Sequence, residues 1–321
     1  MKDQMGRTID YMRISLTDRC NLRCRYCMPQ DIEKIEMSQL LTYEEIAVIA
    51  KCAVELGIVN FKLTGGEPLV RKNAPVLVEM LKAIPGVRTV TMTTNGTLLS
   101  SYAAELKKAG LDGINVSLDT LDADAFAKLT GQTFFPLSSV LEGIKATQQA
   151  DIPLKLNTVN RRDLDWKTLL SYAKDQHLIV RFIEMMPIGY GKDYMGTSNE
   201  NLFAQIQELY GTGIPVTERK GNGPAKYYRF ENYPDEIGFI SAMHHKFCDT
   251  CNRIRLSSEG YLKLCLCYEQ GMDLRKLLRN GSSMKKIKAQ MQQAIAHKPV
   301  EHCFLEKEKM TETQVMAQIG G

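Results

Sequence analysis

The strongest constraint on the fold is a regular alternation of strand-like and helix-like segments over residues 11–184. Short runs rich in apolar and β-branched residues alternate with longer segments whose apolar residues recur at helical spacing. This alternation is typical of βαβ units, which build a parallel sheet. Strands are predicted at 11–17, 58–64, 87–94, 112–118, 154–160 and 178–184, and helices at 42–56, 73–83, 100–109, 137–150 and 166–176.

Six such units can form an incomplete barrel or a doubly wound sheet. We expect an α/β fold with an incomplete (β/α)6 barrel of the TIM type. Beyond residue 184 the pattern changes to a helix at 201–210, hairpin material at 211–230 and a charged helical stretch at 273–297. We therefore predict a barrel domain of residues 1–190 and a C-terminal region of residues 191–321 that covers the open side.

Unusual residues follow each predicted strand. The segment "DRCNLRCRYCMP" follows the first, and "GGEP", "TNG", "SLD", "NTVN" and "EMMP" follow or end the next five. The carboxyl ends of the strands carry the active site in parallel barrels. Gly, Asn and Pro at these places could simply mark turns, but turn formation does not explain the cysteines.

Six of the nine cysteines fall into two groups, spaced C-x3-C-x2-C and C-x2-C-x13-C: Cys20, Cys24 and Cys27, and Cys248, Cys251 and Cys265. An odd total and grouped positions favour metal binding over disulfides. Zinc sites and iron–sulfur clusters usually have four protein ligands, so three cysteines leave one coordination position open. We expect no function for Cys52 or Cys303. Cys267 lies two residues after Cys265 and could be a spare ligand, but we expect it to be a plain neighbour without a function.

Composition narrows the choice of partner. The chain has 41 basic and 37 acidic residues and a net charge of +4, which is too balanced to favour nucleic acid. A local basic pocket could still hold a small polyanion. No run of eighteen apolar residues predicts a membrane span, and the N-terminus lacks the apolar core of a signal peptide. We therefore expect a cytoplasmic protein.

The first cysteine group, with Tyr26 before its last cysteine and "GGEP" after the next strand, resembles the radical S-adenosylmethionine (SAM) superfamily. Motifs along nearly the whole chain resemble the GTP 3′,8-cyclase family within it, also called the molybdenum cofactor biosynthesis protein A family. These motifs are "GRTIDYMRISLTDRCNLRCRYCMP", "LTGGEPLVRK", "TTNG", "NVSLDT", "RFIEMMP", "FCDTCNRIRL" and the terminal "GG".

The resemblance implies a lyase that uses SAM to convert GTP to (8S)-3′,8-cyclo-7,8-dihydroguanosine 5′-triphosphate. This is the first step of molybdenum cofactor biosynthesis, and it releases 5′-deoxyadenosine and methionine. The implied cofactors are SAM and two [4Fe–4S] clusters, one on each cysteine group. The resemblance also implies an electron donor of flavodoxin or ferredoxin type, a homodimer, and hand-over of the product to cyclic pyranopterin monophosphate synthase.

The resemblance further assigns site residues. The implied SAM contacts are Tyr26, Gly66, Glu67, Ser117 and Met186. The implied GTP contacts are Arg13, Lys62, Thr93, Lys155, Arg253, Ile254 and Arg255. Catalytic roles fall on Arg253, Arg255, Gly320 and Gly321, the last two as a tail that reaches the active site. From the residues alone, Arg13 and Lys62 are unusual in strands unless they line a polar interior, and Arg253 and Arg255 face one side of an extended segment.

Two other interpretations stay open. One is a different radical SAM enzyme with an auxiliary cluster, such as a peptide-modifying maturase, although these usually carry more C-terminal cysteines. The other is a zinc-stabilised binding protein for nucleic acid, in which His244 or His245 completes a Cys3His site beside Cys248. The zinc interpretation provides no comparable fourth ligand for the first cysteine group, and it does not explain "GGEP".

Overall fold

The computed structural model describes residues 1–28, 32, 34–194, 196–218 and 220–320. Within this part of the chain one twelve-stranded sheet has the order β12-β11-β10-β1-β2-β3-β4-β5-β6-β9-β8-β7. Its strands are β1 (Tyr11–Ser15), β2 (Asn60–Thr64), β3 (Thr89–Thr94), β4 (Gly113–Ser117), β5 (Leu154–Asn160), β6 (Ile179–Glu184), β7 (Gly213–Val216), β8 (Lys226–Phe230), β9 (Ile237–Ile240), β10 (Arg253–Leu256), β11 (Tyr261–Lys263) and β12 (Gly271–Asp273).

The six predicted strands form the parallel centre of this sheet, so the predicted α/β class is confirmed. The C-terminal part of the chain extends both edges: β10 pairs with β1 and β9 pairs with β6, each in parallel. Antiparallel strands then finish each side, β11 and β12 beyond β10, and β8 and β7 beyond β9. Residues after 190 therefore continue the sheet on both sides.

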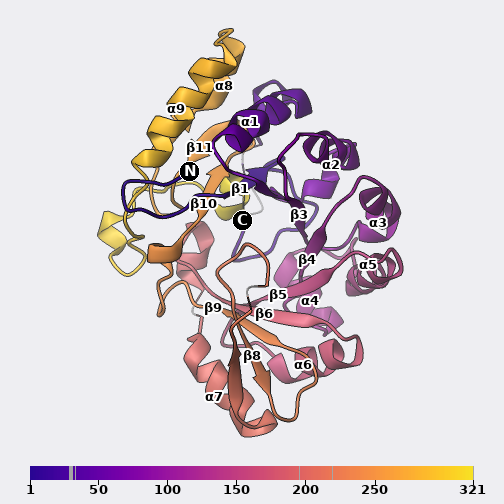
Figure 1. Ribbon diagram of the computed structural model, residues 1–321. Helices are drawn as coiled ribbons and strands as arrows, with labels where there is room; N and C mark the ends of the chain where they lie inside the picture. The colour runs from indigo at the N-terminus through magenta and orange to yellow at the C-terminus, as the bar shows by residue number, and fades with distance from the viewer. Residues whose placement is uncertain (29–31, 33, 195, 219, 321) are drawn as a thin grey trace.

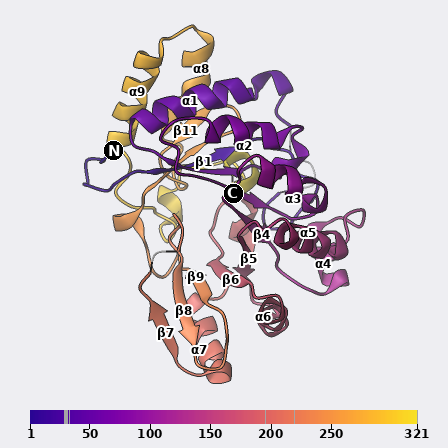
Figure 2. The same cartoon turned by 45° about the vertical axis from the view of Figure 1, so that its right-hand side comes forward.

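Helices α1 (Tyr43–Glu55), α2 (Ala74–Lys82), α3 (Leu99–Lys108), α4 (Ala123–Thr130), α5 (Leu137–Gln149) and α6 (Trp166–Asp175) lie along the outer side of the arc that β1–β6 describe in Figures 1 and 2. The other helices are α7 (Asn199–Tyr210), which follows β6, and α8 (Leu274–Arg279), α9 (Met284–Ala296) and α10 (Met316–Ile319), which follow β12. The five short 3-10 helices are η1 (Met37–Gln39), η2 (Pro68–Val70), η3 (Gly189–Asp193), η4 (Cys248–Thr250) and η5 (Lys307–Lys309). Among the helices of the described residues, none has both the length and the apolar character needed to span a membrane.

Local sequence explains where most helices start and stop. Thr42 and Glu45 form the predicted capping box of α1, each side chain accepting a hydrogen bond from the other's backbone N–H. The predicted stretch 273–297 is instead two helices, because Gly281 (φ 71°) interrupts it. The prediction missed α4, although Asp122 caps its first turn and Gly131 ends it.

The two faces of the central sheet differ in chemistry. On β1 and β2 the fully buried Met12, Ile14, Phe61 and Leu63 belong to the main core. Successive strand residues point to opposite faces, so Arg13 and Lys62 point to the other, inner face. The apolar outer face thus holds the helices in place, and the inner face is left for polar groups.

Candidate active site

The first cysteine group forms a tight loop after β1. The backbone N–H groups of Cys27 and Met28 both donate to the Cys24 carbonyl, at 2.9 Å. Burial and the neighbouring thiols raise the pKa of Cys24 well above its usual range and raise that of Cys27 to about 12. Burial, with Glu67 nearby, raises the pKa of Cys20 to about 11. These three half-buried thiols disfavour one another's negative charge. A shared cationic centre would favour their charged form, so the group suits metal ligation.

The "GGEP" loop packs directly on this cysteine loop. A Cβ atom on Gly66 would lie 2.3 Å from the Arg19 carbonyl oxygen, so no larger residue fits. The buried Glu67 carboxylate accepts hydrogen bonds from the N–H of Leu69 and Asn95 and from the Thr94 hydroxyl, at 2.7–3.0 Å. Burial nevertheless raises the pKa of Glu67 to about 7. Glu67 thus ties the loop after β2 to the end of β3.

Tyr26 is held by a residue to which the sequence analysis gave no role. Its hydroxyl donates to Asp119 Oδ2 at 2.6 Å, and the other carboxylate oxygen accepts from the Val159 N–H at 2.9 Å. Burial raises the pKa of Asp119, while Tyr26 and Arg161 oppose that rise. Asp119 therefore joins the cysteine loop to the ends of β4 and β5. The only local signal was its position directly after a strand.

Basic side chains gather on the inner face of the sheet. Arg13 lies opposite Arg255 on one neighbouring strand and Lys62 on the other. Burial lowers the pKa of Lys62 well below its usual range, and the positive charges of Arg181, Arg13 and Lys155 lower it further. Burial, with Arg13 and Arg253 nearby, does the same to the pKa of Arg255.

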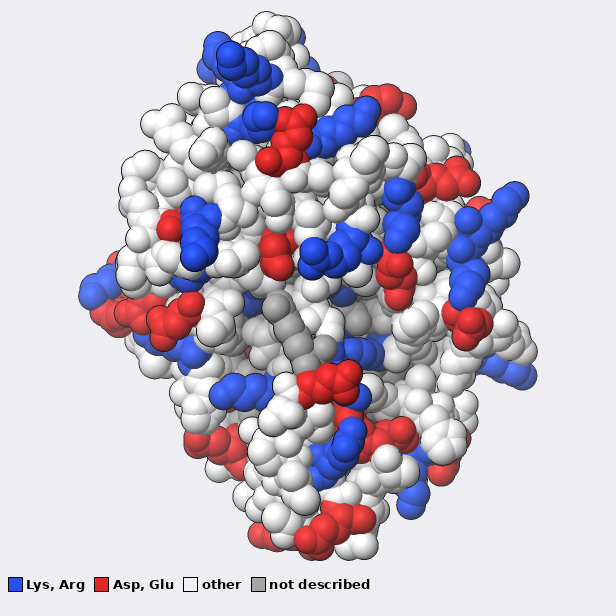
Figure 3. Space-filling model, in the orientation of Figure 1, with Lys and Arg blue, Asp and Glu red and all other residues white. Residues whose placement is uncertain are grey.

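We call these six residues the cationic row: Arg13, Lys62, Lys155, Arg181, Arg253 and Arg255. Its like charges disfavour one another, so an anion bound among them would be stabilised. Figure 3 shows acidic and basic side chains interspersed over the visible face, with blue ones recessed near its middle. The sequence analysis missed Arg181, although it is a basic residue within a strand, which is the signal that identified Arg13 and Lys62.

The other predicted contacts have mixed surroundings. Thr93 Oγ1 is buried and has no hydrogen-bond partner among the described residues. Ser117 ends β4 opposite Asn157. Met186 is partly buried beside the apolar residues Ile188 and Cys267. The Ile254 side chain packs in the main core, away from Arg253 and Arg255.

The second cysteine group is anchored by the N-terminus. The buried Arg7 guanidinium pairs with Asp3 at 2.7 Å and donates to the carbonyl of Cys248 at 3.0 Å. It also donates to the carbonyls of residues 298, 299 and 300. Although burial acts against it, Lys298 and Arg253 lower the pKa of Cys251 to about 7. A thiol that ionises this easily suits metal ligation.

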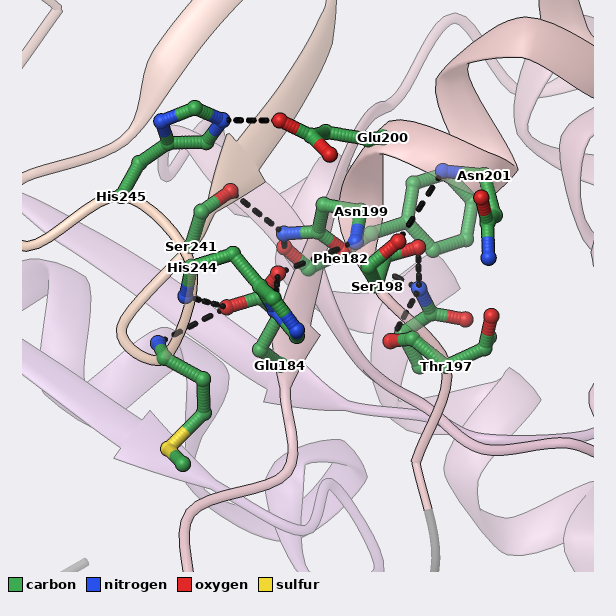
Figure 4. Close-up of polar contacts among 12 residues, drawn as sticks. Phe182, Glu184, Thr197, Ser198, Asn199, Glu200, Asn201, Ser241, His244 and His245 are labelled. Carbon is green, nitrogen blue, oxygen red and sulfur yellow. Dashed lines mark hydrogen bonds and ion pairs between the residues drawn. The ribbon is translucent and has the colours of Figure 1, made fainter. Parts of the chain in front are cut away.

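A network of hydrogen-bonded side chains at the end of β6 holds the segment that leads into the second cysteine group (Figure 4). We call it the Glu184 network. The buried Glu184 carboxylate accepts from the N–H groups of Asn199, Met243 and His244 at 2.8–3.1 Å, and His244 Nδ1 lies 2.9 Å from it. His245 instead contacts Glu200 at 2.7 Å. Both histidines suggested for a zinc site thus contact carboxylates. Within the described ranges, no three His, Cys, Asp or Glu side chains group as ligands of one metal ion.

Replacing Glu184 with alanine is expected to destabilise the fold by about 2–4 kcal/mol, because buried N–H groups lose their acceptor. Burial raises the pKa of Glu184, but its hydrogen bonds outweigh burial and the net pKa is lowered. The carboxylate therefore stabilises the fold above its unfolded pKa, and this contribution is lost as pH falls through the folded pKa. Thermal unfolding measures this effect: the difference in unfolding temperature between E184A and wild type should be smaller near pH 4 than at pH 7.

The matched control is Glu200→Ala, which removes an exposed carboxylate from the exposed His245 beside the Glu184 network. It should change the unfolding temperature little. Equal losses in the two variants would contradict a special role for Glu184.

The C-terminal tail ends against the inner face. The buried Gly320 carbonyl accepts from Arg255 Nη1, and a Cβ on Gly320 would lie 2.9 Å from Thr64 Oγ1 and 3.0 Å from Ser15 Cβ. The end of the described chain thus lies between the carboxyl ends of β1 and β2. Gly321 lies outside the described residues.

Comparison with known proteins identifies the family. The Radical SAM superfamily matches residues 14–175, and Molybdenum Cofactor Synthesis C matches residues 178–304. A protein named GTP 3′,8-cyclase from Clostridium perfringens (strain 13 / Type A) is 40% identical over 325 residues, covering 100% of both chains. The chain belongs to the GTP 3′,8-cyclase family. A second such cyclase, from Syntrophomonas wolfei subsp. wolfei, is 42% identical over 330 residues and also covers 100% of both chains.

The predicted resemblance to the GTP 3′,8-cyclase family is therefore confirmed. Solved structures agree on the fold alone: Streptococcus suis SuiB bound to the precursor peptide SuiA has a TM-score of 0.64 at 13% identity, over 96% of this chain and 75% of that one. HydG, a maturase of the [FeFe]-hydrogenase, has a TM-score of 0.51 at 16% identity, over 64% and 51% of the two chains. At these identities the structural similarity shows a shared fold and does not indicate that this chain is a maturase.

Proposed function

We propose that this member of the GTP 3′,8-cyclase family converts GTP to (8S)-3′,8-cyclo-7,8-dihydroguanosine 5′-triphosphate with SAM as co-substrate, the first step of molybdenum cofactor biosynthesis. The observation that carries the proposal is the cationic row, which reaches from β6 to β10, the strand between Cys251 and Cys265 of the second cysteine group. A triphosphate supplies the negative charge that these buried and half-buried cations need.

The two cysteine groups suit two [4Fe–4S] clusters, the first held by Cys20, Cys24 and Cys27 and the second by Cys248, Cys251 and Cys265. With SAM bound, the first cluster supplies one-electron chemistry that can remove a hydrogen atom from the ribose. The proposed SAM contacts are Tyr26, Gly66, Glu67, Ser117 and Met186. Asp119 fixes the Tyr26 hydroxyl, and Glu67 fixes the loop that approaches the cysteines.

On the substrate side, the chain's own groups bind and orient. Arg13, Lys62, Lys155 and Arg181 would hold phosphate oxygens, and Thr93 offers a hydroxyl to the nucleotide. Arg253 and Arg255 would bridge from the nucleotide to the second cluster. Arg255 also holds Gly320, so the tail would close the cavity and exclude water from the reacting atoms.

The arrangement of the domains is also a proposal. On a flat sheet, strands four positions apart lie about 19 Å from each other. The charge of Arg181 on β6 nevertheless lowers the pKa of Lys62 on β2. This supports an incomplete (β/α)6 barrel over residues 1–190, with residues 191–321 covering its open side.

We further propose a cytoplasmic homodimer that takes electrons from a flavodoxin- or ferredoxin-type donor and hands its product to cyclic pyranopterin monophosphate synthase.

Replacing Gly320 with valine is expected to lower turnover at least about tenfold, because Gly320 has φ 77° and its Cβ would press on Thr64 and Ser15. Iron content should not change, since no cysteine is touched. Cyclised product and iron per chain are measured together. Gly281→Val is the control: it has φ 71° but open space around it. Full activity of G320V would contradict a role for the tail.

The function itself is tested by anaerobic reconstitution with iron and sulfide, followed by addition of dithionite, SAM and GTP. We expect about eight irons per chain, 5′-deoxyadenosine only when GTP is present, and a product with the mass of GTP. SAM cleavage that is indifferent to GTP would retain the radical chemistry and overturn the substrate. Colourless protein that binds zinc without iron would overturn both.

A further inference from the structure

Two cysteines outside both cluster groups meet in the C-terminal region. Cys267 Sγ and Cys303 Sγ lie 2.6 Å apart, and the Cys303 N–H donates to Cys267 Sγ at 3.1 Å. Both are free cysteines, with 0% and 3% exposed area. The sequence analysis expected no function for either and placed Cys303 in a polar tail. Their contact joins segments 36 residues apart in the chain.

The surroundings of this pair link three parts of the molecule. Ile188 comes from the segment after β6, Leu266 from the second cysteine segment, and Phe304 and Ile319 from the C-terminal end. The Glu312 N–H also donates to the Cys267 carbonyl, at 3.4 Å. The pair therefore lies where the C-terminal tail, which ends at Gly320, packs against the loop that carries Cys265.

A buried cysteine is often only a small apolar side chain. That explanation accounts for Cys52, whose sulfur faces the Met284 carbonyl. It accounts less well for two sulfur atoms in direct contact, because an apolar site could be filled by any pair of small side chains. Two thiols already in contact need little movement to form a bond.

We propose that Cys267 and Cys303 are a reversible disulfide site that fastens the C-terminal tail to the second cysteine loop. A small disulfide such as glutathione disulfide is the oxidant. One protein thiolate attacks its S–S bond and releases one thiol, and the second protein thiolate then displaces the other. One S–S bond forms in the protein and one breaks in the oxidant; two electrons and two protons pass from the cysteines to the two thiols released.

The proposed disulfide does not depend on GTP, SAM or turnover. Because both sulfur atoms are buried, the oxidant reaches them only when Phe304 and Ile319 move away. The disulfide would form during these openings and hold the tail more firmly once it has closed. A dithiol reductant would return the tail to its freer state. Oxidation would thus set how often the tail opens.

The test uses cluster-loaded protein incubated anaerobically with glutathione disulfide, quenched in acid, treated with N-ethylmaleimide and mapped by mass spectrometry. We expect a peptide cross-linked through Cys267 and Cys303 that dithiothreitol releases. Cys52→Ser should retain the link, and Cys303→Ser and Cys267→Ser should each lose it. A link that survives C267S comes from Cys265 and overturns the proposal, as does full alkylation of both cysteines in wild type.

A second measurement follows the tail without any variant. Trypsin cleavage after the exposed Lys309 should be at least about fivefold slower in the oxidised protein, and dithiothreitol should restore the original rate. Equal rates in the two forms would overturn the fastening of the tail even if the disulfide forms. Since neither readout involves GTP, failure here leaves the proposed reaction untouched, and failure of the reaction leaves this site untouched.

Discussion

Replacing Cys24 with alanine is expected to abolish SAM cleavage and to lower the iron content from about eight to about four per chain. The loop should stay folded, because it is the Cys24 carbonyl, and not its thiol, that accepts the N–H groups of Cys27 and Met28. The loss should therefore be confined to the first cluster. Iron and sulfide per chain, together with 5′-deoxyadenosine measured by mass spectrometry, check both parts.

Cys52→Ala is the matched control for this variant. Cys52 is as buried as any cluster cysteine but lies within α1, and its replacement should leave about eight irons and full SAM cleavage. If C24A kept all its iron and its activity, Cys24 would not be a ligand. If C24A lost the iron of both groups, the two sites would not load independently.

Lys62→Met is expected to have two opposite effects. Without GTP the protein should unfold at a higher temperature, because a buried cation surrounded by Arg13, Arg181 and Lys155 is removed. GTP should bind about 30-fold more weakly, which corresponds to about 2 kcal/mol for a lost charge partner. Thermal unfolding without GTP and equilibrium dialysis with GTP measure the two effects. Lys226→Met, on the exposed side of β8, should change neither.

The lowered pKa of Lys62 gives this comparison a pH dependence. The unfolded chain holds the lysine proton to higher pH than the folded chain, so wild-type stability rises as pH climbs from the folded pKa toward the unfolded one. The advantage of K62M should shrink over that range. GTP binding by wild type should weaken over the same range, because phosphate needs the charged form. A stability gap that does not change with pH would show that the pKa of Lys62 is not lowered in the folded protein.

The sequence was most informative where the signal was local. All six central strands lie within two residues of their predicted ends, because each is a short apolar run bounded by turn residues. The charged residues Arg13 and Lys62 within such runs correctly marked the inner face. The same reasoning should have found Arg181, and the Asp122 cap and Gly131 should have found α4.

Other features had no local signal. The hydrogen bond of Tyr26 to Asp119 spans 93 residues, and Arg7 reaches Cys248 across 241. Pairing of β10 with β1 joins strands from opposite ends of the chain. Such contacts depend on how the finished sheet brings edges together, and no window of residues records that. Cys303 looked like part of a polar tail for the same reason: apart from the adjacent Phe304, the buried residues packed with it, such as Ile188 and Cys267, are distant in sequence.

The placement of β9 and β10 has a consequence for synthesis. When the ribosome has made the first 190 residues, β1 and β6 are both edge strands with unpaired N–H and C=O groups, which invite pairing with other chains. Their partners are complete only at Leu256, on the order of ten seconds later at ordinary elongation rates. The nascent enzyme is thus exposed to aggregation during that interval, and chaperones that shield strand edges should bind it then.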